Sequence, residues 1–154
     1  MKLTKIIVSP GHDYWVGKGE LTLQHGTQSP NEVVCEAGKG LVGDRYYHGR
    51  SNRKGQVTFI DEAVINAIRQ RFDLAELDDS LFRRNLIVSG ADLSTFLGKR
   101  FELQGVEFEG SQECRPCDWM DRMIAPGVKE FLQENFRGGL RAKVITSGRL
   151  VANS

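Results

Sequence analysis

Short segments of alternating apolar and polar residues, separated by glycine-rich turns, are the strongest structural signal in this sequence. The clearest of them runs from Phe101 to Glu109. If Gln104 and Gly105 form a two-residue turn, the four apolar side chains of this segment share one face and the glutamates lie on the other. Such alternation is typical of half-buried antiparallel strands. The sequence therefore predicts a β-rich fold.

Other segments extend this prediction. Further strands are expected at 20–24, 56–60, 85–88 and 140–144. Asp61 is placed to cap a helix that continues to about Phe72, and Pro126 suits the first turn of a second helix that stops near Gly138. The first helix would present one apolar stripe, made of Val64, Ala67, Ile68 and Phe72. Because strands outnumber helices and regular βαβ alternation is missing, we expect a mainly β fold, a closed or nearly closed barrel with a few short helices.

Length and charge limit the classes of function. The chain has 154 residues, enough for one domain over 1–154, and no shift in composition marks a boundary. Lys and Arg number 21 against 20 for Asp and Glu, which argues against nucleic-acid binding through bulk charge. No signal peptide and no apolar run of about 20 residues is evident, so no membrane partner is expected. We expect a cytoplasmic protein whose three cysteines are free thiols.

The segment Cys114-Arg115-Pro116-Cys117 is the first candidate site. Two thiolates at this spacing can share a soft metal, but a structural zinc site needs a second pair, which the sequence lacks. The alternative is two ordinary buried thiols. If a short helix begins near Asp118, Cys117 lies at its positive end, and Arg115 adds positive charge that favours a thiolate. The carboxylates of Asp118 and Asp121 oppose this effect.

The second candidate is the glycine-rich segment 40–55, which includes Gly43, Asp44, His48, Arg53 and Lys54. Glycines allow backbone N–H groups to approach an anion, and the bases supply charge. The segment matches neither common nucleotide-binding motif, so nucleotide binding is not favoured. The alternative is an exposed loop with solvated bases, in which Asp44 caps a turn. His48 is interpreted as a loop residue.

Two arginine motifs complete the candidates: Arg83-Arg84-Asn85 and Arg137-Gly138-Gly139. Alternation along a strand that begins at Asn85 points one of the two adjacent arginines inward. An inward arginine needs an internal carboxylate or a bound anion as its partner. Both alternatives remain open from the sequence.

Taken in order, these motifs resemble the MOSC domain, named for the C-terminal region of molybdenum cofactor sulfurase. The resemblance covers about Lys5 to Leu150. It is carried by Gly40-Leu41-Val42-Gly43-Asp44 with His48-Gly49, Gln56-Val57 before Asp61-Glu62, Arg84-Asn85, Gly90-Ala91-Asp92-Leu93 with Leu97-Gly98, Cys114 to Cys117, Arg137-Gly138-Gly139 and Val144 to Gly148.

The resemblance implies a β-barrel that binds a molybdenum–pyranopterin cofactor or a related sulfurated metal species. It implies Cys117 as the catalytic residue and the metal or sulfur ligand. Basic residues near that site would hold the pterin phosphate. The cofactor-binding residues expected from the matching motifs are Gly43, Asp44, Arg53, Lys54, Arg84, Asn85, Arg137 and Gly138.

Two functions are compatible with this resemblance. The first is a molybdenum-dependent oxidoreductase, or a subunit of one, that reduces small N-oxygenated compounds with electrons from a separate donor protein. The second is a carrier without turnover, in which Cys117 transfers the cofactor, or its sulfur as a persulfide, to a partner enzyme. The sequence shows no flavin or nicotinamide motif, so the first function requires a partner for electron supply.

Overall fold

The computed structural model describes residues 1–11, 15–16, 20–21, 26–47 and 55–153. Its main sheet has six strands in the spatial order β1, β7, β6, β10, β9, β8. Their bounds are β1 Lys2–Ile6, β6 Val57–Asp61, β7 Leu86–Ser89, β8 Arg100–Leu103, β9 Val106–Glu113 and β10 Leu140–Val144. A second sheet has the order β11 (Gly148–Val151), β4 (Glu32–Glu36), β5 (Gly40–Leu41), and β2 (Trp15–Val16) pairs with β3 (Glu20–Leu21).

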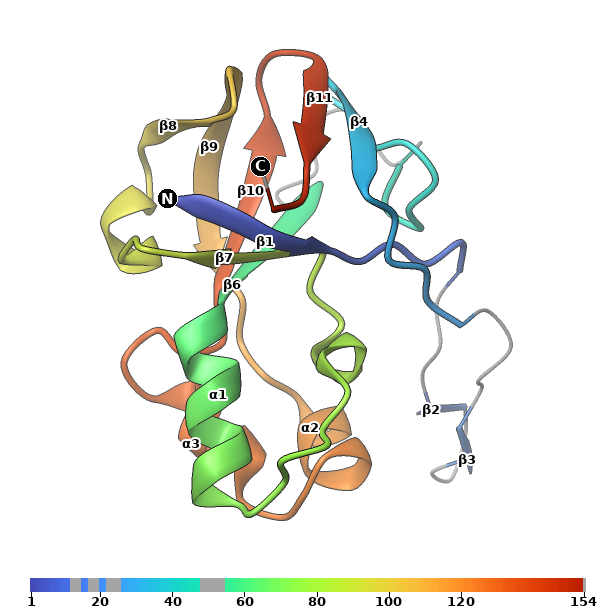
Figure 1. The fold of residues 1–154 in the computed structure, drawn as a ribbon, viewed down its shortest axis with the longest axis vertical. Coiled ribbons are helices and arrows are strands. Elements are labelled where there is room, and N and C mark those ends of the chain that lie inside the picture. Colours follow the sequence, from blue (N-terminus) through green and yellow to red (C-terminus); the bar gives the residue numbers. More distant parts are fainter. Residues whose placement is uncertain (12–14, 17–19, 22–25, 48–54, 154) are drawn as a thin grey trace.

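Helices are few and short. They are α1 Glu62–Arg71, α2 Asp118–Met123, α3 Val128–Gln133 and the 3₁₀ turns η1 Asp79–Phe82 and η2 Leu93–Phe96. Figure 1 shows the main sheet curling, so that β1 and β7 cross the direction of β9 and β10, while α1, α2 and α3 gather at one end of it. The expected mainly β, barrel-type fold is confirmed. Among the described residues, no helix is both long and apolar enough to cross a membrane.

The hairpin predicted from alternation is present in the predicted register. Phe101 pairs with Phe108, and Leu103 pairs with Val106. Gln104 and Gly105 both have positive φ, at 52° and 81°, as a twisted two-residue turn requires. The apolar face meets Phe59 of β6, whose ring lies 5.4 Å from that of Phe101. Register and core packing therefore support each other at this point.

Strands β6 and β7 are buried on both faces, because the sheet separates two apolar clusters. Phe59 and Leu86 face the barrel interior, whereas Ile60 and Ile87 face the cluster beneath the helices. The two strands are parallel, and α1 and η1 form the connection between them. This is the only parallel pair of strands that the described residues contain.

The predicted helices form, with shifted boundaries. Asp61 caps α1, and its carboxylate accepts a hydrogen bond from the Ala63 N–H at 2.9 Å. The buried residues of α1 are Ile65 and Ile68. Ile65 was missing from the expected stripe, which is centred one residue away from the true contact face. Strand β3 forms the first two residues of the strand expected at 20–24, and residues 22–24 lie outside the described residues.

The second predicted helix is shorter than expected. Helix α3 begins at Val128, two residues after Pro126, and ends at Gln133. It does not reach Gly138, because Asn135 and Phe136 have left-handed backbone conformations that break the helix. The short helix considered near Asp118 is present. Helix α2 begins at Asp118, and Cys117 occupies its N-cap position.

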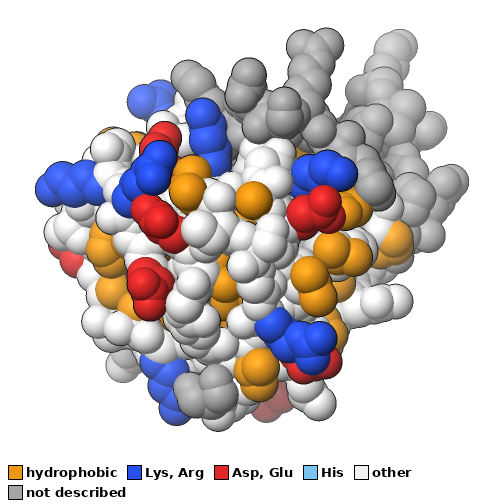
Figure 2. Space-filling view, turned by 90° about the horizontal axis from the view of Figure 1, so that it is seen from above, with side chains coloured by type: hydrophobic (Ala, Val, Ile, Leu, Met, Phe, Trp, Pro, Cys, Tyr) orange, Lys and Arg blue, Asp and Glu red, His pale blue; other side chains and the backbone are white. Residues whose placement is uncertain are grey.

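The exposed surface has a mixed charge. Figure 2 shows basic and acidic side chains lying next to one another on the face at the top of Figure 1. Exposed ion pairs join Arg100 with Glu107, Arg149 with Glu32 and Lys39 with Glu36. Such pairs stabilise the fold little, and they leave no extended basic patch on this face.

The close approach of Gly139, just before β10, to the backbone of Phe59 leads to a stability prediction. Gly139 has φ +100°, and a Cβ there would lie 2.0 Å from the Phe59 carbonyl oxygen. We expect Gly139→Ala to lower the free energy of unfolding by about 3 kcal/mol or more, from strain and overlap together. Urea unfolding measures this loss. Gly98→Ala is the matched control, because Gly98 also has positive φ but no atom near its Cβ position. Equal losses in the two variants would contradict the steric argument.

Candidate functional site

Two adjoining cavities lie where the end of β9, the start of α2 and the segment before β7 meet. The larger, which we call the thiol cavity, has a volume of about 460 Å³ and is lined by Cys114 and Cys117. The second cavity has a volume of about 240 Å³ and a more apolar lining that includes Ile7, Leu81 and Met123. The two share four lining residues, which are Arg45, Arg83, Arg84 and Trp119.

The thiol cavity is strongly basic. Five arginines line it: Arg45, Arg83, Arg84, Arg115 and Arg141. No aspartate or glutamate is among its described lining residues. The mixed surface of the protein therefore surrounds a cavity of one sign. Because low-dielectric walls strengthen the field inside a cleft, this arrangement favours an anionic ligand.

Cys117 is held at the mouth of this cavity by the start of α2. Its side chain is exposed and makes no capping hydrogen bond, while its carbonyl accepts the Met120 N–H at 3.1 Å. Lys129 engages the two nearby carboxylates: its Nζ lies 2.7 Å from Asp118 Oδ1, and its backbone N–H donates to Asp121. The hydrogen bond with Asp118 raises the pKa of Lys129. The Asp118 carboxylate, which was expected to oppose a thiolate at Cys117, is thus paired with the Lys129 ammonium group.

The other two cysteines are buried. Cys35 is fully buried in β4, and this burial raises its pKa to about 12. The backbone of Cys114 is tied in place, because its N–H donates to the Gly139 carbonyl at 2.8 Å. Within the described residues, no three side chains of His, Cys, Asp and Glu come together in a geometry for a metal ion. The described residues alone therefore form no closed zinc site.

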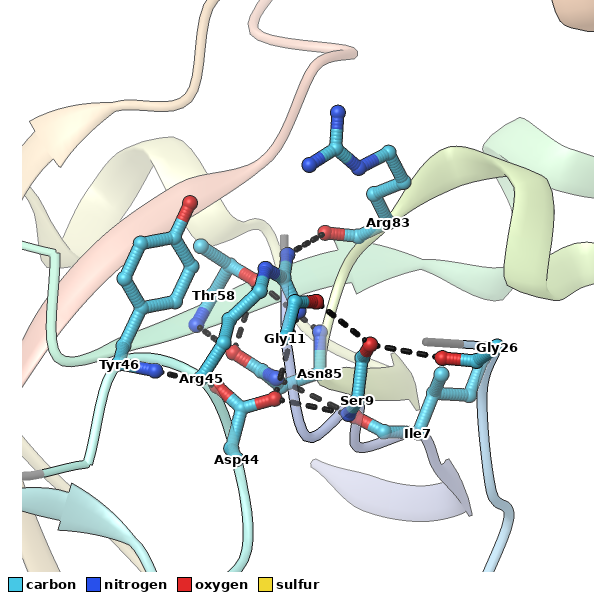
Figure 3. Close-up of polar contacts among 10 residues, drawn as sticks. All are labelled: Ile7, Ser9, Gly11, Gly26, Asp44, Arg45, Tyr46, Thr58, Arg83 and Asn85. Atoms are coloured by element: carbon cyan, nitrogen blue, oxygen red, sulfur yellow. Dashed lines mark hydrogen bonds and ion pairs between the residues drawn. The ribbon is translucent and has the colours of Figure 1, made fainter. Parts of the chain in front are cut away.

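Asp44 lies under the cavity as a buried carboxylate with several donors. It accepts hydrogen bonds from the Ser9 N–H at 3.1 Å and from the Tyr46 N–H at 3.3 Å (Figure 3). It also forms an ion pair with Arg45 at 3.3 Å. Asp44 was expected to bind the cofactor. In the structure its carboxylate is buried and pairs with Arg45, which lines both cavities.

Arg45 carries an unsatisfied donor. Its side chain is 7% exposed, and its terminal nitrogens donate to Asp44 and to the Arg83 carbonyl, each at 3.3 Å. Its Nε is buried and has no hydrogen-bond partner. A buried donor left unpaired costs about 1–3 kcal/mol. An anionic group in the cavity would satisfy it.

Arg83 lines both cavities, and its guanidinium has no hydrogen-bond partner among the described residues. Its Cζ lies 4.6 Å from the centre of the Trp119 ring, a cation–π contact. Figure 3 shows this side chain pointing away from the Asp44 network. Burial lowers the pKa of Arg83, and the neighbouring Arg45 guanidinium lowers it further. The protein thus holds a charge here that lacks an anionic partner among the described residues.

Arg84 is buried, and within the protein its partners are backbone carbonyls rather than a carboxylate. Its guanidinium donates to three backbone carbonyls: Gly138 at 2.9 Å, Phe82 at 2.9 Å and Cys114 at 3.4 Å. These carbonyls take the place of the internal carboxylate that was one of the two expected partners. Arg84 therefore joins three chain segments, and it still lines both cavities.

Asn85 is a structural residue of the sheet. Its Oδ1 accepts from the Thr58 N–H at 3.0 Å, and its Nδ2 donates to the Ile7 carbonyl. The side chain thus continues the β6–β7 ladder by one position. Because Asn85 is almost completely buried and its groups are used within the protein, the structure does not place it among the lining residues of either cavity.

The remaining predicted residues line neither cavity or lie outside the residues that the structure describes. Arg137 stacks on Phe131 at 4.0 Å and pairs with Glu134, and it lines neither cavity. Gly138 supports the site indirectly, since a Cβ there would lie 2.1 Å from the Cys114 carbonyl oxygen. Gly43 has φ +92° in the turn before Asp44. Arg53, Lys54 and His48 lie outside the described residues.

The structure adds two lining residues outside every candidate motif, Arg141 and Trp119, and two that lay within candidate motifs without an assigned role, Arg45 and Arg83. Arg45 lay within the glycine-rich segment. Only the structure shows that Arg45 turns inward, where it pairs with Asp44, the carboxylate that also accepts the Ser9 N–H. Arg141 alternates outward on β10, a position that the strand prediction already implied. Trp119 follows Cys117 by two residues, and no periodic signal marks it.

The three hydrogen bonds from Arg84 to backbone carbonyls, which we call the Arg84 clamp, should stabilise the fold. Arg84→Ala leaves three carbonyls without their donors, so we expect the free energy of unfolding to fall by about 2–4 kcal/mol in urea. Arg149→Ala is the control, because Arg149 pairs with Glu32 on the exposed surface and should contribute about 0.5 kcal/mol or less. Equal stability of the two variants would show that the clamp is unimportant.

The three thiols should differ in reactivity. At pH 8, a pKa of about 12 leaves about one Cys35 in ten thousand as thiolate, and Cys114 is shielded by burial. A chromogenic disulfide reagent should therefore react quickly with one thiol in the native protein and with three after unfolding. Cys117→Ser should remove the fast reaction. A second fast thiol in the native protein would contradict the burial of Cys114.

Comparison with known proteins places the chain in a family. A model of the MOSC domain matches residues 41–153. None of the curated proteins matches the sequence. Similar solved structures include YuaD from Bacillus subtilis, with 16% identity and a TM-score of 0.64 over 97% of this chain and 94% of that one.

Two YiiM proteins have the same fold. The protein from Escherichia coli has 18% identity and a TM-score of 0.63 over 99% of this chain and 67% of that one. The protein from Geobacillus stearothermophilus has 12% identity and a TM-score of 0.66 over 97% of this chain and 71% of that one. This chain thus spans about two thirds of the length of these longer relatives. Such identities establish the fold alone, whereas the match over 41–153 shows that the chain belongs to the MOSC domain family, which is linked to the C-terminal domain of molybdenum cofactor sulfurase.

Proposed function

We propose that this protein binds a molybdenum cofactor in the thiol cavity, with Cys117 as the protein ligand to the metal, and reduces small N-oxygenated compounds. The observation that carries the proposal is the placement of an exposed thiol in a cavity lined by five arginines and by no described carboxylate. A thiolate is a soft ligand suited to molybdenum. The arginines suit the anionic pterin phosphate.

The residues present fit such a group. Arg45 Nε is a buried donor without a partner, and the Arg83 guanidinium makes no hydrogen bond, so both have donors to offer a bound phosphate. The bound cofactor would supply two-electron redox chemistry at its metal. The protein's part is to hold Cys117 at the start of α2, to orient Arg45 through Asp44 and to keep carboxylates out of the cavity.

The second cavity offers space for a small substrate beside the cofactor. Its apolar side chains and the Trp119 indole suit a compact molecule with an apolar or aromatic part. We propose a separate protein as the electron donor, since the sequence shows no flavin or nicotinamide motif that could deliver electrons to the metal. Transfer of the cofactor or its sulfur to a partner enzyme is the alternative, and the exposure of Cys117 is the observation that favours it.

Metal and pterin content test the proposal. The protein is purified without air from cells that make abundant molybdenum cofactor. We expect near-stoichiometric molybdenum and pterin in the wild type and their loss in Cys117→Ser, because a hydroxyl is a poor ligand in place of a thiolate. Cys114→Ala is the matched control and should retain both, as Cys114 belongs to the same motif but is buried.

Retention of molybdenum by Cys117→Ser, or equal loss from Cys114→Ala, would overturn the assignment of the ligand. Turnover then separates the two functions. The loaded protein is mixed with an artificial electron donor and an N-hydroxylated substrate. Consumption of the substrate supports the reductase, and stoichiometric loading without consumption supports the carrier.

A further inference from the structure

We propose that an extended, acidic segment of the partner protein docks in an open groove beside the thiol cavity, where it adds a strand to the free edge of β9. The inference deepens the proposed function, because it gives the separate electron donor a place to bind. It rests on that function only for the role of the partner, since binding of the segment needs neither metal nor pterin.

Strand β9 is longer than the strand that covers its outer edge. Strand β8 pairs with residues 106–109 of β9, and a bridge between Leu97 and Gly110 adds one more position. Beyond Gly110, the described part of the chain provides no strand on this side. On the other side, β10 continues to pair with β9 as far as Glu113. The last residues of β9 therefore have one open edge.

The turn before β8 leaves this edge free. The Gly98 N–H donates to the Gly110 carbonyl at 2.9 Å, and Gly98 has φ +74°, so the chain turns there instead of continuing along β9. The crossing is close, because a Cβ on Gly110 would lie 2.2 Å from the Phe96 carbonyl oxygen. The ladder between β8 and β9 consequently ends at Gly110.

The backbone of Glu113 is directed to the open edge. The next residue, Cys114, donates its N–H to the Gly139 carbonyl at 2.8 Å, on the side of β10. Neighbouring residues in an antiparallel strand direct their backbone groups to opposite sides. The N–H and C=O of Glu113 thus face away from β10. Backbone groups at an uncovered edge are those to which an added strand binds.

A groove with a volume of about 600 Å³ follows this edge. Its lining includes Leu97 and Glu113, together with Arg115 and Arg141. Arg115 and Arg141 also line the thiol cavity, so the groove adjoins the cavity that holds Cys117. A segment bound in the groove is therefore anchored next to the thiol.

Charge and apolar surface indicate the chemistry of the segment. Arg115 and Arg141 are exposed, and neither forms an ion pair with any described residue. Glu113 supplies the one carboxylate among the described lining residues, so the groove has an excess of positive charge. Leu97 is 45% exposed and offers an apolar contact. A segment that contains both acidic and apolar residues matches these features.

Fluorescence anisotropy of a labelled peptide tests the docking. The probe is a blocked peptide of alternating glutamate and valine, about eight residues long, within the usual length of a strand. We expect saturable binding to the full chain without metal. A peptide with lysine in place of glutamate should bind at least tenfold more weakly, because its charge is reversed.

A third peptide separates strand addition from attraction between charges. It has the side chains of the probe but methylated backbone amides, so it cannot donate hydrogen bonds to the edge of β9. We expect at least tenfold weaker binding than for the probe. Equal binding of these two peptides, or no saturable binding of the probe up to about 1 mM, would overturn the proposal.

A substitution at Leu97 tests the location. Leu97→Asp adds negative charge to the groove and removes its apolar contact, so we expect at least tenfold weaker binding of the probe. Val42→Asp is the matched control, because Val42 is 43% exposed but lines neither the groove nor the thiol cavity. Equal affinities in the two variants would refute the groove as the site. If Leu97→Asp does not fold, Leu97→Ala replaces it, with at least threefold weaker binding expected.

A reactive form of the probe tests whether the groove leads to the thiol. With a bromoacetyl group at one end or the other, the probe should alkylate Cys117 at least tenfold faster than bromoacetamide, because docking raises the local concentration of the reagent. The thiolate displaces bromide in this reaction. Leu97→Asp should abolish the acceleration, and Val42→Asp should keep it. No acceleration from either end would contradict docking beside Cys117.

The docking site and the cofactor site can fail separately. Leu97→Asp should retain molybdenum and pterin, since Leu97 does not line the thiol cavity. Absence of Cys117-dependent molybdenum refutes the cofactor site and leaves the peptide results unchanged. Failure of the peptides to bind refutes the docking site and leaves the metal content unchanged.

Discussion

The grip of Arg84 on three backbone carbonyls is the constraint on which the candidate site depends. Those carbonyls belong to Phe82 before β7, Cys114 after β9 and Gly138 before β10. The chain can approach this closely only because residue 138 has no Cβ, which would overlap with the Cys114 carbonyl. One buried guanidinium therefore fixes the segment that leads to Cys117 relative to the sheet.

This arrangement explains how the protein tolerates several cations in one small space. Arg84 is solvated by carbonyl dipoles, Arg45 is neutralised by Asp44, and Arg83 contacts the electron-rich face of an indole. Each charge has a different kind of compensation, and only the first two involve hydrogen bonds. The compensation is incomplete at Arg83 and at Arg45 Nε, both of which line the cavities. The atoms that hold the cluster together are thus different from those left without a hydrogen-bond partner among the described residues.

Sequence reasoning worked where one local pattern determines the structure. The hairpin of β8 and β9 followed from alternation and one turn, and α1 followed from its cap. Strand β1 was missed because its pairing with β7 contains a register shift between Leu3 and Lys5, which interrupts alternation. The site was predicted less completely. The resemblance suggested Arg137 as a cofactor-binding residue, but its guanidinium stacks on Phe131 and it lines neither cavity, which only the tertiary structure shows.

The conformation of Arg83 shows why two adjacent arginines can serve one site. In a regular strand, neighbouring side chains point to opposite faces, so alternation allows only one of the pair to reach a cavity. Arg83 instead has φ 58° and ψ 35°, a left-handed conformation that interrupts the alternation just before β7. Both Arg83 and Arg84 consequently line the same two cavities. A glycine would adopt this conformation with less strain, but it would remove the cation from the Trp119 ring. The backbone and the charge thus favour different residues at position 83, and the arginine keeps its cation beside the Trp119 indole at the cost of a strained, left-handed backbone.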